Sequence, residues 1–459
     1  MGGDAARPGA EDRPPAAGLP RLAAARLHPD GGQGLRPAAR SEPKRVLLLL
    51  PTNTYRAHDF LEAARQVGVE TVVGSDRRQT LEDLAPARLV TLDLHDPETA
   101  AAQIARFAAA HPLDAVIPTD DESAEVAARA SALLGLPHNP PEAARAARHK
   151  DELRRLLRAA GVRTPRAHPL RPDADPVRLA REQSYPCVLK PTFLAASRGV
   201  IRADDEEQFV AAFRRIAALV ALPEVAERAR GIGAAMLVEE FVPGAEVALE
   251  GILAGGRLKT LAIFDKPDPL DGPFFEETIY VTPSRHPEAT QRALEATTAA
   301  AAAALGLREG PVHAELRVND LGPWLIELAA RSIGGLCSRT LRFGAGISLE
   351  ALILMHAVGR GVEEYNRERQ AAGVMMIPVP RAGILKEVRG LQEARRVSGI
   401  VDITISATLG RPLVPLPEGN AYPGFVFGRG ASPEEVEAAL REAHRRLTFV
   451  VEPDESRRS

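Results

Sequence analysis

Apolar residues near the start of the chain form short runs, and stretches of helical periodicity separate these runs. Residues 46–50 are all apolar, a helical pattern then ends near Val67, and a second strand-like run follows at 70–74. The same succession recurs where 115–118 precedes an alanine-rich helical stretch that ends at Leu134. Apolar strands that alternate with helices indicate a parallel sheet covered on both faces. We therefore predict an α/β fold with a Rossmann-like N-terminal domain.

Dinucleotide binding is the obvious function for such a domain, but the sequence argues against it. The turn after Leu50 reads Pro-Thr-Asn-Thr-Tyr and lacks the glycines that let a backbone approach a pyrophosphate. The cleft of this domain should therefore bind a substrate, or it should only pack against the rest of the protein.

The pattern changes after the proline pair at 140–141. A helix is predicted over 142–160, with Gly161 as its end signal. Residues 185–260 indicate short β segments around one long helix, 311–327 a β-hairpin, and the region after Gly346 a further α/β lobe.

Composition excludes several classes of partner. The chain has 459 residues and a formal net charge of −3, and its charged residues are interspersed, so we expect neither nucleic acid nor membrane as a partner. No apolar segment reaches the roughly 20 residues that span a bilayer. Cys187 and Cys337 alone provide no disulfide framework and no zinc site, which fits the cytoplasm. Residues 1–41 are rich in Ala, Pro, Gly and Arg and are predicted to be a disordered leader.

A lysine stands at the end of the apolar strand 185–191. Lys190 directly precedes the segment 192–199, which contains small residues including Ser197. A lysine delivers a compact charge to a triphosphate, and small residues let backbone amides and a hydroxyl close over the oxygens. An ordinary loop below a strand-terminal lysine explains the segment equally well.

A second strand, 236–242, ends in two acids followed by Phe241 and Val242 and then a Pro-Gly turn. Glu239 and Glu240 are the two acids, and Glu246 lies just beyond the turn. A purine needs apolar walls with polar groups at its edge, and a ribose needs a carboxylate. By itself the segment favours a plainer interpretation, in which the acids are exposed at a strand rim.

The hairpin carries the strongest signal. Period-two alternation places His313, Glu315 and Arg317 on one face, and a turn centred near Leu321 sets Glu315 opposite Glu327. Opposed carboxylates repel each other unless a cation lies between them, and Mg²⁺ is the natural cation for such a pair.

The alternative is a surface hairpin whose acids pair with Arg317 and Arg331. The aliphatic opposite face and the Gly334-Gly335 pair that follows argue against it. His313 either touches substrate or is only a hydrogen-bonded neighbour of Glu315.

Over about residues 43 to 450 these motifs, in this order, resemble the ATP-grasp superfamily. The resemblance rests on Lys150, Lys190 with its loop, the segment 239–242, Glu315, and Glu327 with Arg331. It implies two α+β lobes that clasp ATP after the Rossmann-like domain, followed by a C-terminal α/β extension. The implied divisions are an N-terminal domain over 42–147, an ATP-grasp domain over 148–345 with a lid at about 185–242, and a C-terminal lobe over 346–459.

The resemblance also implies the cofactors and their residues, namely ATP and Mg²⁺, with Mn²⁺ as an alternative. Lys150, Lys190 and Ser197 would contact the phosphates, and Glu239, Glu240, Phe241 and Val242 the adenine. Glu246 would bind the ribose, and Glu315 and Glu327 the metal.

Within the superfamily the chain looks most like the L-amino-acid ligases, which make dipeptides. The likeness rests on Glu-Leu-Ala-Ala-Arg-Ser-Ile-Gly-Gly at 327–335 and on Phe-Phe-Glu-Glu at 274–277. It implies that Arg331 stabilises the charge of the acyl phosphate and that Glu276 holds an amino group. Ala329 stands where many ATP-grasp enzymes carry an asparagine, so a second metal would be held less fully.

We therefore expect an ATP-dependent ligase that joins a carboxylate to an amine through an acyl phosphate, on amino-acid substrates. His313, Gly334 and Gly335 are further candidates for substrate contact. Two alternatives stay open: a carboxylase that acts through carboxyphosphate, and a non-catalytic ATP-binding module. The sequence leaves open whether the chain forms a homodimer.

Overall fold

The structure is a computed structural model that describes residues 43–52, 54–79, 82–227 and 235–454. The predicted leader lies outside the described residues. The described residues from Pro43 onward form one compact unit by their contacts. Within the described part, no helix is both long enough and apolar enough to cross a membrane.

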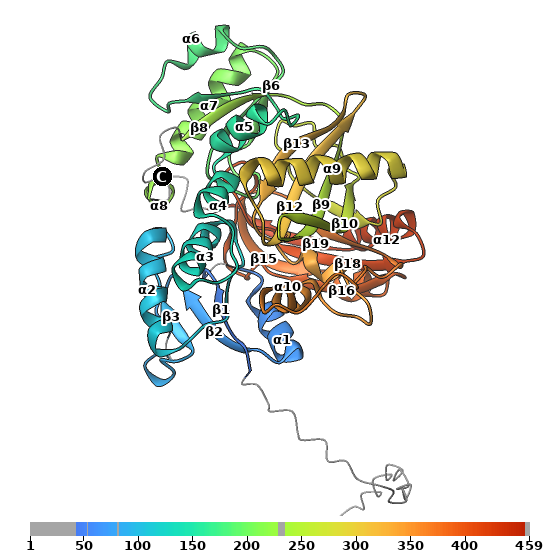
Figure 1. Ribbon diagram of the computed structural model, residues 1–459. Coiled ribbons are helices and arrows are strands. Elements are labelled where there is room, and N and C mark those ends of the chain that lie inside the picture. The colour runs from blue at the N-terminus through green and yellow to red at the C-terminus, as the bar shows by residue number, and fades with distance from the viewer. Residues whose placement is uncertain (1–42, 53, 80–81, 228–234, 455–459) are drawn as a thin grey trace, which may run out of the picture. The chain divides into compact units, whose positions relative to one another are not determined.

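The N-terminal part is the predicted parallel sheet with helices on both faces (Figure 1). Its strands, in the order β3-β2-β1-β4, are β1 (Arg45–Leu49), β2 (Glu70–Ser75), β3 (Leu89–Thr91) and β4 (Ala115–Pro118). Its helices are α1 (Ala57–Val67), α2 (Pro97–Ala110) and α3 (Asp121–Leu134). Alternate residues of β1 enter different cores, because Val46 and Leu48 pack with α1 whereas Leu47 and Leu49 pack with α2 and α3.

The predicted helix over 142–160 is wrong in one respect, since the chain breaks at His149. α4 (Pro141–Arg148) and α5 (Lys150–Ala159) flank this residue, which has an extended backbone with φ −93° and ψ 103°. The main-chain N–H of Lys150 donates to the carbonyl of Thr192 at 3.1 Å. The break therefore places Lys150 at the first turn of α5, against the segment 192–199.

The lid contains an antiparallel sheet with the order β5-β8-β6-β7. Its strands are β5 (Ala167–Leu170), β6 (Cys187–Pro191), β7 (Ile201–Ala203) and β8 (Met236–Glu240), and its helices are α6 (Pro176–Arg181), α7 (Glu206–Val220) and α8 (Pro223–Ala226). Because β5 pairs with β8, this sheet begins before residue 185, where the sequence placed the start of the lid.

A second, eight-stranded sheet has the order β13-β12-β9-β10-β11-β14-β18-β16. Its strands are β9 (Ala245–Ala254), β10 (Arg257–Lys266), β11 (Ile279–Thr282), β12 (Gly310–Asn319), β13 (Gly322–Ala329), β14 (Ala371–Met376), β16 (Ile400–Ile405) and β18 (Gly424–Gly430). The sheet crosses the predicted boundary at 345/346, because β14 pairs with β11. The two regions that this boundary separates therefore share one sheet.

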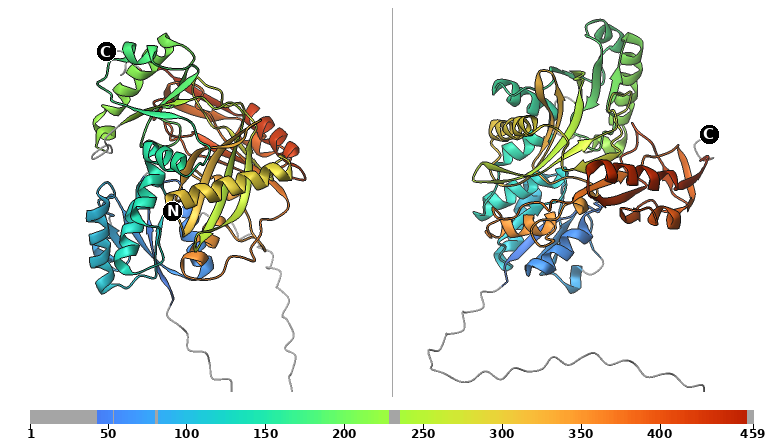
Figure 2. Two further views of the ribbon diagram at one scale, coloured as in Figure 1. Left: turned by 45° about the horizontal axis from the view of Figure 1, so that its top comes forward. Right: turned by 90° about the vertical axis from the view of Figure 1, so that its right-hand side faces the viewer.

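Helices and a small third sheet complete this part of the chain. α9 (Glu288–Leu305) lies along one face of β9, β10 and β13, as Figures 1 and 2 show. The other elements are α10 (Leu349–Ala357), α11 (Leu391–Arg395), α12 (Pro433–Arg445) and a sheet of β17 (Pro412–Leu413), β15 (Gly383–Arg389) and β19 (Thr448–Glu452). α10 packs on α1 and thereby joins the N-terminal sheet to the rest of the unit.

Candidate active site

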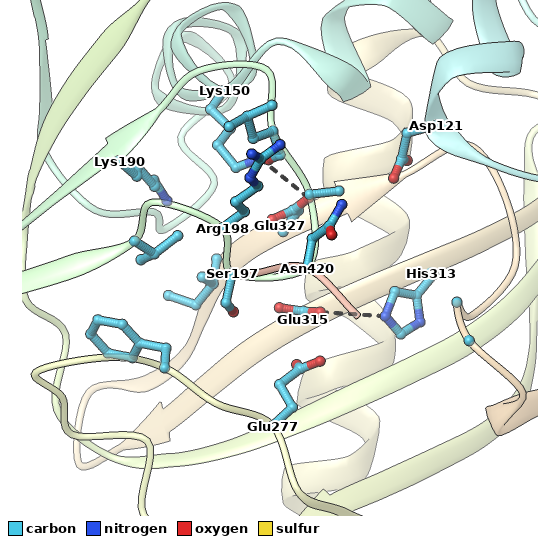
Figure 3. Close-up of a pocket in the computed structure, with 18 of the residues that line it drawn as sticks. Asp121, Lys150, Lys190, Ser197, Arg198, Glu277, His313, Glu315, Glu327 and Asn420 are labelled. Carbon is cyan, nitrogen blue, oxygen red and sulfur yellow. Dashed lines mark hydrogen bonds and ion pairs between the residues drawn. The ribbon is translucent and has the colours of Figure 1, made fainter. Parts of the chain in front are cut away.

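A cavity of about 330 Å³ brings together residues from the N-terminal sheet, the lid and the large sheet. Figure 3 shows Lys150 and Lys190 on one side of it and Glu315 and His313 on another. The sequence-predicted residues that line the cavity are Lys150, Lys190, Ser197, Glu239, Glu240, Phe241, Val242, Glu246, His313, Glu315, Glu327, Arg331, Gly334 and Gly335. Glu276 is the predicted residue that the cavity wall does not contain.

Lys190 is held by a buried carboxylate. Its Nζ lies 2.6 Å from Glu239, and the Nε of Arg154 lies 2.7 Å from the other oxygen of the same carboxylate. Burial lowers the pKa of Lys190, although Glu239 opposes this effect. The Glu239 carboxylate thus fixes Lys190 between β6 and β8, where adjacent antiparallel strands place the two side chains. Sequence reasoning assigned Glu239 to the adenine and did not identify this contact.

Lys150 joins the segment 192–199 to the hairpin. Its Nζ donates to the carbonyl of Leu194 at 2.8 Å and lies 3.5 Å from the carboxylate of Glu327. Ala196 and Ser197 both have φ near +55°, a left-handed conformation that turns the chain sharply. Lys150, Ser197 and this tight turn therefore line the same cavity as Glu327.

The hairpin register is confirmed, since Glu315 and Glu327 are directly paired on β12 and β13. A β-bulge between Glu315 and Leu316 shifts the pairing nearer the turn. The surface-hairpin alternative is wrong, because Arg317 pairs with Glu246 at 2.9 Å and Arg331 pairs with Asp121.

Glu315 also belongs to a group of three carboxylates. Oxygens of Glu246, Glu277 and Glu315 lie within 4.8 Å of one another, and Lys266 is in contact with all three. Burial lowers the pKa of Lys266, but the three carboxylates outweigh burial and leave this pKa well above its usual value. Lys266 therefore offsets part of the negative charge on this side of the cavity.

The donor set at Glu315 and Glu327 fits Mg²⁺. The two side chains are 22% and 28% exposed, unlike the buried Glu239 and Glu246, so oxygens of both remain accessible from the cavity. Mg²⁺ binds one or two carboxylates and keeps other positions for water and phosphate oxygens.

His313 lies between two acids. Its Nδ1 is 3.1 Å from Glu250. Its Nε2 is 3.5 Å from Glu315, as Figure 3 shows by a dashed line. Burial lowers the pKa of His313, but the two carboxylates outweigh burial and raise this pKa to about 9. Glu250 also accepts from the main-chain N–H of Ile333 at 3.0 Å. His313 thus carries a positive charge at neutral pH and links Glu315 to the segment after Arg331.

Arg331 is oriented by a residue that sequence reasoning missed. Its guanidinium donates to the carboxylate of Asp121 at 2.8 Å, and both residues line the cavity. Burial raises the pKa of Asp121, but Arg331, Lys150 and Arg148 together outweigh burial, and the net shift of this pKa is downward. Asp121 begins α3 directly after β4, at the carboxyl end of a parallel sheet, where ligands of open α/β sheets usually bind. The position of Asp121 after this strand is the sequence feature that could have identified it.

The structure places Glu277, rather than its predicted neighbour Glu276, in the cavity wall, so contact between Glu276 and an amino group stays a prediction. The Glu276 carboxylate accepts from the main-chain N–H of Val379 at 3.2 Å. Glu277 lines the cavity instead, because Lys266 and the hydroxyl of Tyr280 hold its carboxylate there.

Part of the cavity wall is apolar and lies apart from the lid core. Ile333, Cys337 and Met376 belong to one hydrophobic cluster, and Tyr55 and Tyr422 pack against it. The Tyr55 and Tyr422 rings lie 5.6 and 6.1 Å from that of Phe425. The sequence did not predict this wall, since its residues come from widely separated segments.

Comparison with known families agrees with this geometry. Residues 183–340 match the ATP-grasp domain, residues 61–138 the ATP-grasp N-terminal domain, and residues 375–452 the L-amino acid ligase C-terminal domain 2.

Individual relatives point the same way. The crystal structure of L-amino acid ligase from Bacillus licheniformis is 27% identical, with a TM-score of 0.74 over 89% of this chain and 99% of that one. Alanine--anticapsin ligase of Bacillus subtilis (strain 168) is 28% identical over 265 residues, which are 55% of each chain. Carnosine synthase 1 of Gallus gallus is 32% identical over 35% of this chain and 18% of that one. The chain spans about half the length of the first of these curated relatives.

The fold, the cavity and these matches define an ATP-grasp protein. Within that superfamily, the chain is similar to the L-amino-acid ligases.

Proposed function

We propose that the protein is an ATP-dependent, ADP-forming ligase that joins the carboxylate of one amino acid to the amine of another through an acyl phosphate. The observation that carries this proposal is the convergence of Arg331, Lys150 and the Glu315–Glu327 pair on one cavity. A fixed guanidinium in a partly buried site stabilises the negative charge that develops during acyl transfer. A module that only binds ATP has no need of such a group.

ATP and Mg²⁺ are the proposed cofactors, with Mn²⁺ as an alternative. Lys150, Lys190 and Ser197 would hold the phosphates, whereas Glu240, Phe241 and Val242 would border the adenine. When bound, the metal ion neutralises phosphate charge, and Glu315 and Glu327 would hold it.

Glu246 keeps its proposed role as the acid that binds the ribose. Its carboxylate already accepts from Arg317 and Lys266. A carboxylate offers about four acceptor positions, so Glu246 can still accept from a ribose hydroxyl.

The proposed chemistry needs water to be excluded. The lid carries Lys190 and the segment 192–199, so its closure over the nucleotide would shield an acyl phosphate until the amine attacks. Asp121 orients Arg331 for this step, and His313 holds Glu315 in place.

The apolar wall adds to the proposal on the substrates. A nucleotide held by the lid and the hairpin has no need of Ile333, Cys337 and Met376, and an amino-acid side chain is the group that remains to cover them. We therefore include amino acids with an apolar side chain among the substrates. His313, Gly334 and Gly335 stay candidates for substrate contact. We also keep as proposals the domain limits given above, a cytoplasmic location and the formation of a homodimer.

The test is to measure ADP and phosphate release with MgATP and pairs of amino acids, and to identify the products by mass. A product of dipeptide mass formed in step with ADP is expected. The Glu327→Ala variant should retain the fold by circular dichroism and lose turnover. ADP release that requires bicarbonate would instead favour a carboxylase, and ATP binding without turnover would favour a binding module.

A further inference from the structure

The positive charges that line the cavity are nearly all engaged by the protein. Lys190 pairs with Glu239, Lys150 with Glu327, Arg317 with Glu246, Arg331 with Asp121 and His313 with Glu250. Arg198 donates to the carbonyl of Glu418 at 2.9 Å. These groups therefore reach a ligand while they keep a protein partner.

Arg148 is the exception among the residues that the structure describes. It lines the cavity, yet it forms no hydrogen bond or ion pair within the described ranges, and its buried Nε has no acceptor there. It ends α4, two residues before Lys150, and its charge acts on Asp121. Arg148 thus lies on the side of the cavity where Asp121 holds Arg331.

A partly buried guanidinium without an acceptor is unusual in a folded protein, because its lost hydration is not replaced. A ligand that brings an anion to the cavity wall would provide the acceptor that replaces this lost hydration. The planar fork of arginine matches the two oxygens of a carboxylate, and it also matches phosphate oxygens.

We propose that Arg148 binds the carboxylate of the amino acid that supplies the amine. This inference rests on the proposed ligase function and extends it to one residue and one group of the substrate. That carboxylate is not consumed in the reaction, so it is free to anchor the amino acid. Phosphate oxygens of ATP are the other source of the same chemistry, but the proposed function already assigns Lys150 and Lys190, on α5 and β6, to them.

The experiment compares Arg148→Gln and Arg148→Lys with a matched control, Arg145→Gln. Arg145 lies one turn earlier on α4 and pairs with Glu152 at 3.1 Å, outside the cavity wall. KM is measured separately for ATP, for the amine-supplying amino acid and for its carboxamide, which keeps the amine but lacks the anion.

For Arg148→Gln we expect KM of the amine-supplying amino acid to rise by about 10-fold or more, with KM for ATP within about twofold. About 1.4 kcal/mol corresponds to that tenfold change. In the wild-type protein, KM for the carboxamide should exceed KM for the amino acid by about the same factor. In Arg148→Gln, the amino acid and its carboxamide should have similar KM values. Arg148→Lys should recover part of the loss, and Arg145→Gln should match the wild type.

An unchanged KM for the amine-supplying amino acid in Arg148→Gln would overturn the inference and leave the ligase function intact. An increase confined to ATP would also overturn it and would assign Arg148 to the phosphates. Absence of dipeptide product from the wild-type protein, by contrast, would remove the ligase function itself.

Discussion

Arg331 donates a 2.8 Å hydrogen bond to Asp121, a residue 210 positions earlier in the chain. The pair joins the end of the hairpin to the first turn of α3, so the N-terminal sheet contributes directly to the cavity. Arg56 supports the same junction, because its buried guanidinium donates to the carbonyl of Thr119 and to the hydroxyl of Ser332. The N-terminal domain therefore positions the residue that we assign to charge stabilisation.

Asp121→Asn should lower kcat by on the order of 10- to 100-fold, because small misplacements of a catalytic group are costly. KM for ATP should stay within about twofold, since the lysines that face the phosphates are untouched. Steady-state kinetics with saturating amino acids would measure this effect. Asp114→Asn, which breaks an ion pair of the same domain with Lys44, is the control and should leave kcat unchanged. Wild-type kcat in Asp121→Asn would contradict the role given to the pair.

Met376 and Met375 offer a matched test of the apolar wall. Both are 3% exposed neighbours on β14, but Met376 lines the cavity whereas Met375 packs in a different cluster. Either change to alanine should cost about 2–5 kcal/mol in the free energy of unfolding. Only Met376→Ala should raise the ratio of kcat/KM for a bulky apolar amino acid to that for alanine. The same change in selectivity in Met375→Ala would show that loss of core packing in general, and not the apolar wall, causes the change.

The motifs were predictable wherever local pattern determines position. Strict alternation placed Glu315 opposite Glu327, and the strand before the segment 192–199 placed Lys190 at the cavity. The alternating strands and helices gave the N-terminal sheet for the same reason.

The side chains that pair with these motif residues were not predictable, because they come from distant segments of the chain. Nothing local in the sequence links Lys266 to three acids or Asp121 to Arg331. The break at His149 was missed because helical periodicity continues across it, and a hydrogen bond from the main chain of Lys150 to the lid decides the conformation.

The Arg215–Glu418 ion pair should matter more for binding than for stability. It joins lid helix α7 to the segment that follows β17, with an N–O distance of 2.8 Å, and both side chains are more than 40% exposed. Exposed pairs contribute about 0–1 kcal/mol to folding. We expect Glu418→Gln to unfold at nearly the wild-type denaturant concentration and to raise KM for ATP several-fold at low salt, because the lid loses a contact. Glu182→Gln, which breaks an exposed pair between Arg178 of α6 and the residue that ends this helix, should leave KM for ATP unchanged.

His149 should make folding sensitive to acid. Burial, reinforced by the charge of Arg148, lowers its pKa to about 4, against about 6.5 in the unfolded chain. The folded protein therefore holds the neutral imidazole, and the unfolded chain takes up a proton first. This contribution to stability is complete above pH 6.5 and is lost as pH falls toward 4.

Urea unfolding of the wild type and of His149→Gln at pH 7.5, 6 and 5 would measure the contribution of His149. The variant should lose less stability than the wild type between pH 7.5 and 5, whereas His58→Gln, whose side chain is 80% exposed, should follow the wild type. Parallel curves for the wild type and His149→Gln would show that the pKa of His149 is the same in the folded and the unfolded protein.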